Sequence, residues 1–288
     1  MQPAPEDRLS TGEGKKAGSS RLKLAVLVVA VIIGVVYFAS DRKEPPVADD
    51  PATMAPAAAP PLPAALPPAP DIPAIADPVV QSLPEAPPPE PPVTLEGSDL
   101  ELRETLAGPD DSTLIAQALQ SNDLVHRSAG LIDGLSRGLV PRKILPLPPP
   151  QEKFSTRTAA DGQTYVDPAS YTRYDSYSEA IASLDADQLA AVFHRYRSLL
   201  EQAYTEFGYS AGDMDNALIR SLDNILATPE LTEPVALKRK EAVFIYVDPA
   251  LEQLSPLQKQ VLRMGPENAA IVKRQAELLR NALLGASQ

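Results

Sequence analysis

The chain of 288 residues contains no cysteine and only two histidines, and basic side chains are in the minority. The absence of cysteine excludes disulfides, lipid-modified cysteine, thiol catalysis and metal sites built from thiolates. With 26 lysines and arginines against 38 aspartates and glutamates, the formal net charge is −12. Because phosphate binding needs a basic surface, we expect no nucleic-acid partner.

The motifs of several catalytic and metal sites are also absent. His126 and His194 lie far apart, each before an arginine, and the chain has no HExxH spacing that would bind zinc. It has no GxSxG turn for a nucleophilic serine and no glycine-rich loop for a phosphate. We therefore predict no metal, no cofactor and no catalytic residue of these kinds, and we interpret both histidines as exposed helix residues.

One long apolar run lies near the N-terminus, over residues 24–39. It predicts a transmembrane helix over residues 22–40. Bulky aromatic residues stand where a signal-peptide cleavage site requires small ones, so we expect an uncleaved anchor. Five basic residues precede the run and only two follow it closely, which predicts a cytoplasmic tail over residues 1–21 and export of everything after Ser40.

Proline is abundant, and 18 of the 32 prolines fall in residues 41–96 with alanine and acidic side chains. A segment without aromatic residues and with this composition cannot bury enough apolar surface to fold alone. It favours polyproline II, which lengthens by about 3.1 Å per residue. We predict a disordered spacer of at most roughly 170 Å over residues 41–96; the alternative is a ligand for a proline-binding module.

Residues 97–288 predict one mostly helical domain, because apolar residues recur at helical spacing between capping signals. The expected helices are one opened by a capping box from Ser98 to Glu101, a short one in "DDSTLIAQAL", one along 124–135 ended by Gly138, one from Asp185 to Gly208, one over 214–227, one capped by Ser255 and ended by Gly265, and one over 266–284.

Two stretches depart from the helical pattern. "FSTRTAADGQTYVD" has β-prone residues on both sides of Asp161 and Gly162, which predicts a hairpin. "EAVFIYVDP" fits a third strand or a buried helical turn, and its length does not separate the two. The predicted fold class is therefore mainly α, with a small β-hairpin or antiparallel sheet, preceded by one transmembrane helix and a disordered spacer rich in proline and alanine.

Three tyrosines recur every third position, at 171, 174 and 177. On a helix they share one face, where tyrosine usually packs its ring and sends its hydroxyl to a partner at the rim. Core packing is one interpretation. A binding groove with the "RMGPEN" turn nearby is the other, and its candidate residues are Tyr171, Arg173, Tyr174, Tyr177, Arg263, Gly265, Pro266, Glu267 and Asn268.

The strings "GLIDGLSRGLVPRKILPL", "YTRYDSYSEAIASLDADQLAAVFHRYRSLLEQAYTEFGY", "LIRSLDNILATPE" and "VDPALEQLSPLQKQVLRMGPENAAIVK" resemble the bacterial family called domain of unknown function 3014. The resemblance covers about residues 94–288. It implies an N-terminal anchor, a proline-rich spacer and a Gram-negative envelope setting. It supplies no catalytic residue, because the family has no established activity.

These observations lead to three hypotheses. The first is a single-pass inner-membrane protein whose periplasmic domain is a binding or adaptor module for an envelope protein or peptidoglycan. The alternative is a membrane-anchored envelope hydrolase using paired carboxylates, since aspartate and glutamate are plentiful. The third is a domain that mainly self-associates. We favour the non-enzymatic hypothesis, because a free enzyme acting on a soluble substrate needs neither anchor nor spacer.

Overall fold

The computed structural model describes residues 69–73, 94–106, 113–144, 147–231, 234–241 and 243–285. The predicted cytoplasmic tail and the predicted transmembrane helix over residues 22–40 lie outside these ranges, as does most of the predicted spacer. Within the described ranges, no helix is both long enough and apolar enough to cross a bilayer.

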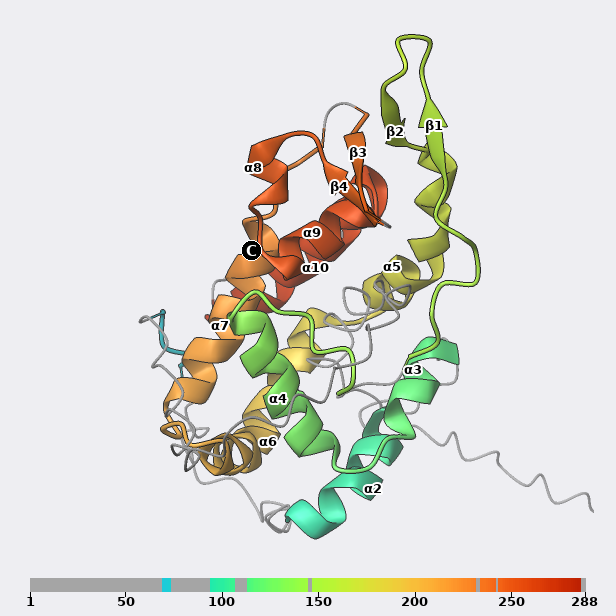
Figure 1. Cartoon of the computed structure of the whole chain (residues 1–288). Coiled ribbons are helices and arrows are strands. Elements are labelled where there is room, and N and C mark those ends of the chain that lie inside the picture. The colour runs from blue at the N-terminus through green and yellow to red at the C-terminus, as the bar shows by residue number, and fades with distance from the viewer. Residues whose placement is uncertain are drawn as a thin grey trace, which may run out of the picture.

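Helices make up most of the described chain (Figure 1), which confirms the mainly helical prediction. They are α2 (Leu95–Leu106), α3 (Thr113–Leu119), α4 (Leu124–Ser136), α5 (Asp175–Ala182), α6 (Ala186–Glu206), α7 (Asp213–Leu226), α8 (Pro249–Glu252), α9 (Pro256–Arg263) and α10 (Pro266–Leu283), with 3₁₀ turns at Pro168–Ser170 and Thr172–Tyr174.

Local capping fixes several helix ends where the sequence predicts them. The Asp185 side chain accepts a hydrogen bond from the Gln188 amide at the start of α6, and Gly208 follows its end with φ of +90°. At α9, Ser255 and Gln258 form a reciprocal capping box. These bonds satisfy amides that a helix leaves without an internal partner.

The predicted capping box of α2 is wrong. The helix begins at Leu95, so Ser98 lies inside its first turn, where it is buried and donates its hydroxyl hydrogen bond to the Leu95 carbonyl at 2.8 Å. Glu101 instead accepts from Arg195 of α6, with 3.0 Å between Nε and Oε1. The glutamate therefore ties α2 to α6 rather than capping its own helix.

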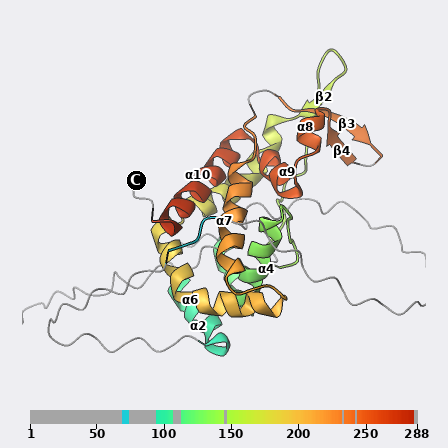
Figure 2. The same ribbon diagram turned by 90° about the vertical axis from the view of Figure 1, so that its left-hand side faces the viewer.

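The main apolar core lies between α4, α6, α7 and α10 (Figure 2), and α5 packs against α10. Its largest side chains are fully buried, among them Leu135, Phe193, Tyr204, Leu218 and Leu279. The broad apolar stripe of α6 supplies one wall of this core, as the helical spacing predicts.

A four-stranded antiparallel sheet lies at the end of the molecule away from α2 (Figures 1 and 2). Its strands are β1 (Thr156–Thr158), β2 (Thr164–Val166), β3 (Ala236–Lys240) and β4 (Val243–Tyr246), in the order β1-β2-β3-β4. The predicted hairpin is confirmed as β1 and β2, and the ambiguous stretch forms β4. Strand β3 is an addition that the sequence analysis did not anticipate.

A second, smaller apolar cluster joins the sheet to the rest of the domain. Val166, Val235, Leu237 and Tyr246 are buried in it. Tyr171, which lies between the two 3₁₀ turns, packs its half-buried side chain against this cluster. The sheet is therefore attached through contacts close to the predicted site.

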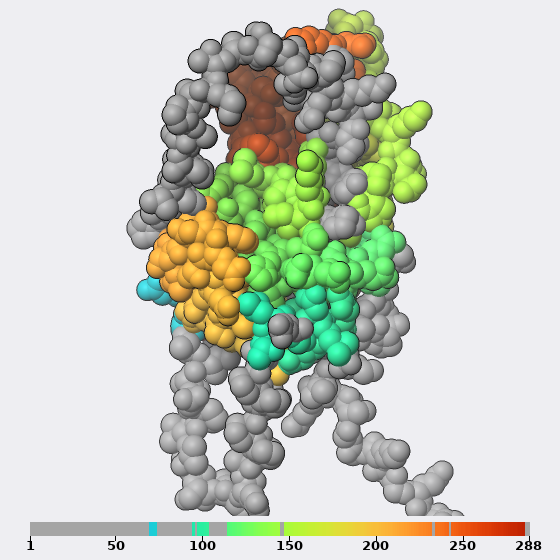
Figure 3. Space-filling view, turned by 60° about the horizontal axis from the view of Figure 1, so that its bottom comes forward, coloured from blue at the N-terminus to red at the C-terminus, as the bar shows by residue number. Residues whose placement is uncertain are grey.

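Residues 69–73 pack against the helical body, although they fall in the predicted spacer. Ile72 is 3 % exposed and belongs to the main apolar core. Arg197 of α6 donates from Nη1 to the Ile72 carbonyl at 3.4 Å. In the space-filling view these residues lie beside the surface of α6 and α7 (Figure 3). We call residues 69–73 the docked segment.

Candidate functional site

The two predicted segments, the tyrosine cluster and the "RMGPEN" turn, meet at the start of α10. Asn268 in the first turn of this helix is buried. Its Nδ2 donates to the Tyr171 carbonyl at 3.1 Å, to Asp175 Oδ1 at 2.9 Å and to the Met264 carbonyl at 3.1 Å. Ser178 donates its hydroxyl to Asn268 Oδ1. One amide side chain thus joins α5, α9 and α10.

Gly265 lies directly against the side chain of Tyr171 in this junction. Its φ of +86° is a conformation that residues with a side chain rarely adopt. A Cβ atom there would lie 2.4 Å from Cγ of Tyr171, which is inside the repulsive distance. The position therefore needs glycine both for its backbone and for the tyrosine ring packed on it.

Tyr174 and Tyr177 form part of the core wall. They are 1 % and 4 % exposed, with ring centroids 6.2 Å apart in a tilted arrangement. Tyr177 donates its hydroxyl to the Pro148 carbonyl at 2.5 Å. Burial raises the pKa of the Tyr174 hydroxyl above its ordinary value. These two rings therefore pack in the core, and neither ring lines a groove open to solvent.

Arg173 is also buried, at 6 % exposed. Its Nε donates to the Ser170 carbonyl at 2.7 Å, and its guanidinium lies over the rings of Phe154 at 5.5 Å and Tyr174 at 5.1 Å. Burial lowers the pKa of this guanidinium. These contacts fasten the segment before β1 to the start of α5.

The remaining candidates reach the surface. Arg263 is half-buried, and Pro266 and Glu267 are exposed. Burial raises the pKa of the Tyr246 hydroxyl to about 12, while the charge of Arg263 acts in the opposite direction. Arg263 therefore lies near the sheet cluster. A binding role for these residues stays a prediction, and Arg263 acts on Tyr246 of the sheet.

The strands themselves carry an uneven charge that the sequence analysis missed. Arg157, Lys238, Arg239 and Lys240 are all exposed, and none of the four strands contains a carboxylate. Within the described ranges, no carboxylate lies within ion-pair distance of these four cations. The run "ALKRK" was the available signal, and it is notable in a chain with net charge −12.

Strand register sorts these cations between the two faces of the sheet. Arg157 is opposite Tyr165, Lys238 is opposite Ile245, and Lys240 is opposite Val243. Side chains alternate along a strand, so these pairs share the face opposite the buried Leu237 and Tyr246.

We call this face the cationic face, made by Arg157, Tyr165, Lys238, Lys240, Val243 and Ile245. On the other face, beyond the buried cluster, Arg239 lies opposite Phe244, which is 37 % exposed and has its ring centroid 6.0 Å from that of Phe154.

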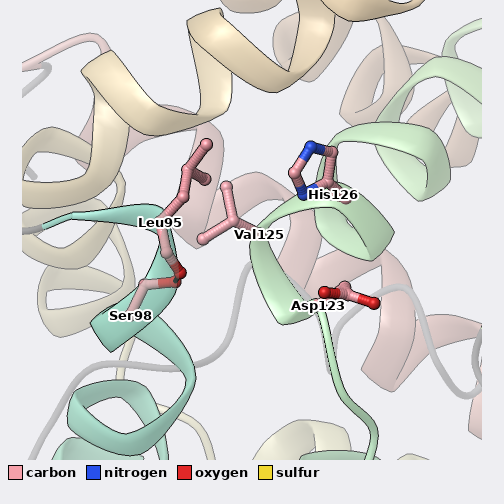
Figure 4. A pocket seen from close by; sticks show the side chains of 5 residues that line it. All are labelled: Leu95, Ser98, Asp123, Val125 and His126. Atoms are coloured by element: carbon pink, nitrogen blue, oxygen red, sulfur yellow. Dashed lines mark hydrogen bonds between the residues drawn. The ribbon is translucent and has the colours of Figure 1, made fainter.

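A small pocket of about 160 Å³ lies between α2 and α4 (Figure 4). Its polar residues do not form a nucleophile and base pair. His126 Nε2 is 2.9 Å from Oε2 of Glu206, whereas the Ser98 hydroxyl is bonded to its own helix. Figure 4 shows Ser98 and His126 on different helices with Val125 between them. Within the described ranges, no group of three histidines or carboxylates could hold a metal.

The hydrolase hypothesis directs attention to Asp215, the one carboxylate that is buried among the described residues. Desolvation raises its pKa to about 6, the charges of Glu201 and Asp71 act in the same direction, and the charge of Arg197 opposes them. Arg197 donates from Nη2 to Asp215 Oδ2 and from Nε to Glu201 Oε1 at 3.1 Å. The carboxylate is thus held by an arginine beside the docked segment.

Comparison with known proteins identifies one family. The family model described as "Protein of unknown function (DUF3014)" matches residues 124–280. This range contains α4 to α9, most of α10 and the whole sheet. No curated protein and no solved structure matches the chain.

Proposed function

Since the chain belongs to the DUF3014 family, whose function is unknown, we propose that it is a single-pass inner-membrane protein with a periplasmic binding domain. The apolar run over residues 24–39 and the charge difference across it support the anchor and its orientation. The domain binds an anionic envelope partner, protein or peptidoglycan, through the cationic face.

The charge of the sheet carries this proposal. Three exposed cations, Arg157, Lys238 and Lys240, lie on the cationic face, and the four strands contain no carboxylate, in a chain that is otherwise acidic. Such a surface attracts an anionic partner and orients it during the encounter. The sheet also lies at the end of the domain away from α2 (Figures 1 and 2).

The geometry gives less support to the envelope hydrolase. A glycosidase-type site needs two carboxylates facing a substrate space. Asp215 faces Arg197, and the docked segment lies beside it. The pocket between α2 and α4 contains neither residue.

The test is proximity labelling in cells with the full chain, the label being fused after Gln288. Lys238→Glu combined with Lys240→Glu reverses two charges on the cationic face and should reduce capture of the partner at least tenfold. The matched control reverses the exposed Lys143 and Arg274, which lie outside the sheet. It makes the same change in net charge and should leave capture within twofold.

Sedimentation of the same variants with purified peptidoglycan distinguishes the two kinds of partner. If the parent and the control variant bind peptidoglycan in a salt-sensitive way and the sheet variant does not, the partner is peptidoglycan. Loss of a labelled protein without any peptidoglycan binding identifies a protein partner. Equal capture by the parent and the sheet variant would refute the cationic face as the binding surface.

A further inference from the structure

The docked segment has a single buried anchor. Ile72 is 3 % exposed, whereas Pro70, Asp71 and Pro73 are exposed around it. Ala69 is half-buried and also touches the main core. The apolar contact between this part of the spacer, which is rich in proline and alanine, and the helical body is thus made mainly by one branched aliphatic side chain.

The polar part of the contact depends on one arginine. The Arg197 guanidinium donates to the Ile72 carbonyl, to Glu201 and to the buried Asp215. The same cation therefore binds the backbone of the docked segment and forms ion pairs with two carboxylates of the helical body, whose combined charge exceeds its own. Asp71 adds a third negative charge near Asp215, and its repulsion disfavours the docked state.

These contacts suit reversible docking. Burying one isoleucine favours the docked state by a factor of roughly 10 to 100. Pro70 and Pro73 restrict the free segment, so less conformational freedom is lost when it docks. The repulsion between Asp71 and Asp215 makes the docked state less favourable than burial of Ile72 alone would make it.

We propose that the surface of α6 and α7 around Arg197 is a binding site for the chain's own spacer, and that this docking sets how far the domain reaches from its anchor. The second part rests on the proposed function. At about 3.1 Å per residue, residues 41–68 reach roughly 90 Å, whereas residues 41–94 reach roughly 170 Å. Release of Ile72 therefore nearly doubles the maximal reach, while the cationic face is unchanged.

The docking is tested in the full chain, where the absence of cysteine makes introduced thiols unique. Spin labels on Pro70→Cys and Ser198→Cys, both exposed positions, report the distance between the segment and α6. The parent should give one narrow distance distribution, and Ile72→Asp should broaden it. Leu83→Asp is the matched control, because Leu83 also precedes a proline in the spacer, and it should leave the distribution narrow.

A measurement without a core substitution guards against misfolding of Ile72→Asp. Excess synthetic peptide of residues 66–76 should compete for the site and broaden the distribution in the labelled parent. A broad distribution in the parent, or a narrow one that neither Ile72→Asp nor the peptide changes, would overturn the docking.

The reach is tested separately, with the full chain in lipid nanodiscs and dyes on Asp41→Cys and Glu277→Cys. Energy transfer should fall when Ile72→Asp releases the segment. Unchanged transfer in a chain that remains in the nanodisc would overturn the effect on reach. Failure of the chain to enter the nanodisc would instead refute the proposed anchor, and the spin-label result would stand independently.

Discussion

Replacing Gly265 with alanine should destabilise the domain through two separable effects. The φ of +86° and ψ of 167° lie in a region that is accessible almost only to glycine, and forcing alanine there costs about 1 to 3 kcal/mol. The new Cβ would also lie 2.4 Å from Cγ and 2.7 Å from Cβ of Tyr171. Relief of that overlap requires the ring and backbone to move, at a further cost of about 1 to 3 kcal/mol.

Gly162 in the turn between β1 and β2 provides the matched control. Its φ is +82°, but a Cβ there would meet nothing within 4 Å. Gly162→Ala should therefore lower the free energy of unfolding by only about 1 to 2 kcal/mol. We would measure urea unfolding by circular dichroism on a fragment of residues 69–288. Equal losses for the two variants would refute the argument that Tyr171 packs against Gly265.

Two further predictions concern buried polar groups. Asn268→Ala removes the donor to the Tyr171 carbonyl and should lower the free energy of unfolding by about 2 to 4 kcal/mol; an equal loss in the exposed neighbour Glu267→Ala would contradict this. For Asp215, the folded pKa of about 6 exceeds the ordinary value of 3.8, so the folded state binds the proton more tightly. The free energy of unfolding should therefore be highest with respect to Asp215 below about pH 4, where this residue is protonated in both states. It should decrease by at most about 3 kcal/mol as the pH rises to 6 and the folded state loses the proton. Asp215→Asn should abolish that part of the pH dependence in urea unfolding. Burial lowers the pKa of His194, which makes the stability rise with pH and so opposes the effect of Asp215. The free energy of unfolding of the parent is therefore compared with that of the variant at each pH. A difference between the two that stays constant from pH 4 to 7 would reject the prediction.

The helices could be predicted because their limits depend on residues close in sequence. Asp185 and Ser255 each cap a helix through an amide three positions later, and Gly208 ends α6. Ser98 shows where this reasoning fails. The same spacing of serine and glutamate occurs there, but the helix starts earlier, since Leu95 precedes the serine and Glu101 has a better partner on α6.

The sheet could be predicted only in part, because its pairing is not local. Strand β2 pairs with β3, with Thr164 opposite Leu237. Only Leu237 of β3 is buried, and three cations follow it, so the strand lacks the apolar alternation that sequence patterns detect. The docking of Ile72 could not be predicted from the sequence either, because several other apolar residues in the spacer also precede a proline.

The tyrosine cluster and the "RMGPEN" turn show that a sequence can group two segments correctly without fixing what they do. The two segments do meet, through Asn268 and Gly265, across more than 90 positions of sequence. Their contacts are with each other. A substitution such as Tyr174→Ala would open the main core, so a loss of partner capture could not be separated from damage to the fold.

The exposed charges of Lys238 and Lys240 are better probes of binding, because changing them leaves the junction intact. The junction fixes the orientation of the sheet through Tyr171, which contacts both Gly265 and the sheet cluster. The docked segment accepts a hydrogen bond from Arg197 of α6, whereas the junction joins α5, α9 and the start of α10. Charge reversal on the sheet should therefore change partner capture without releasing Ile72, and release of Ile72 should change reach without changing affinity. If either variant produced both effects, the sheet and the docked segment would be coupled, and the domain could no longer be treated as a rigid body between them.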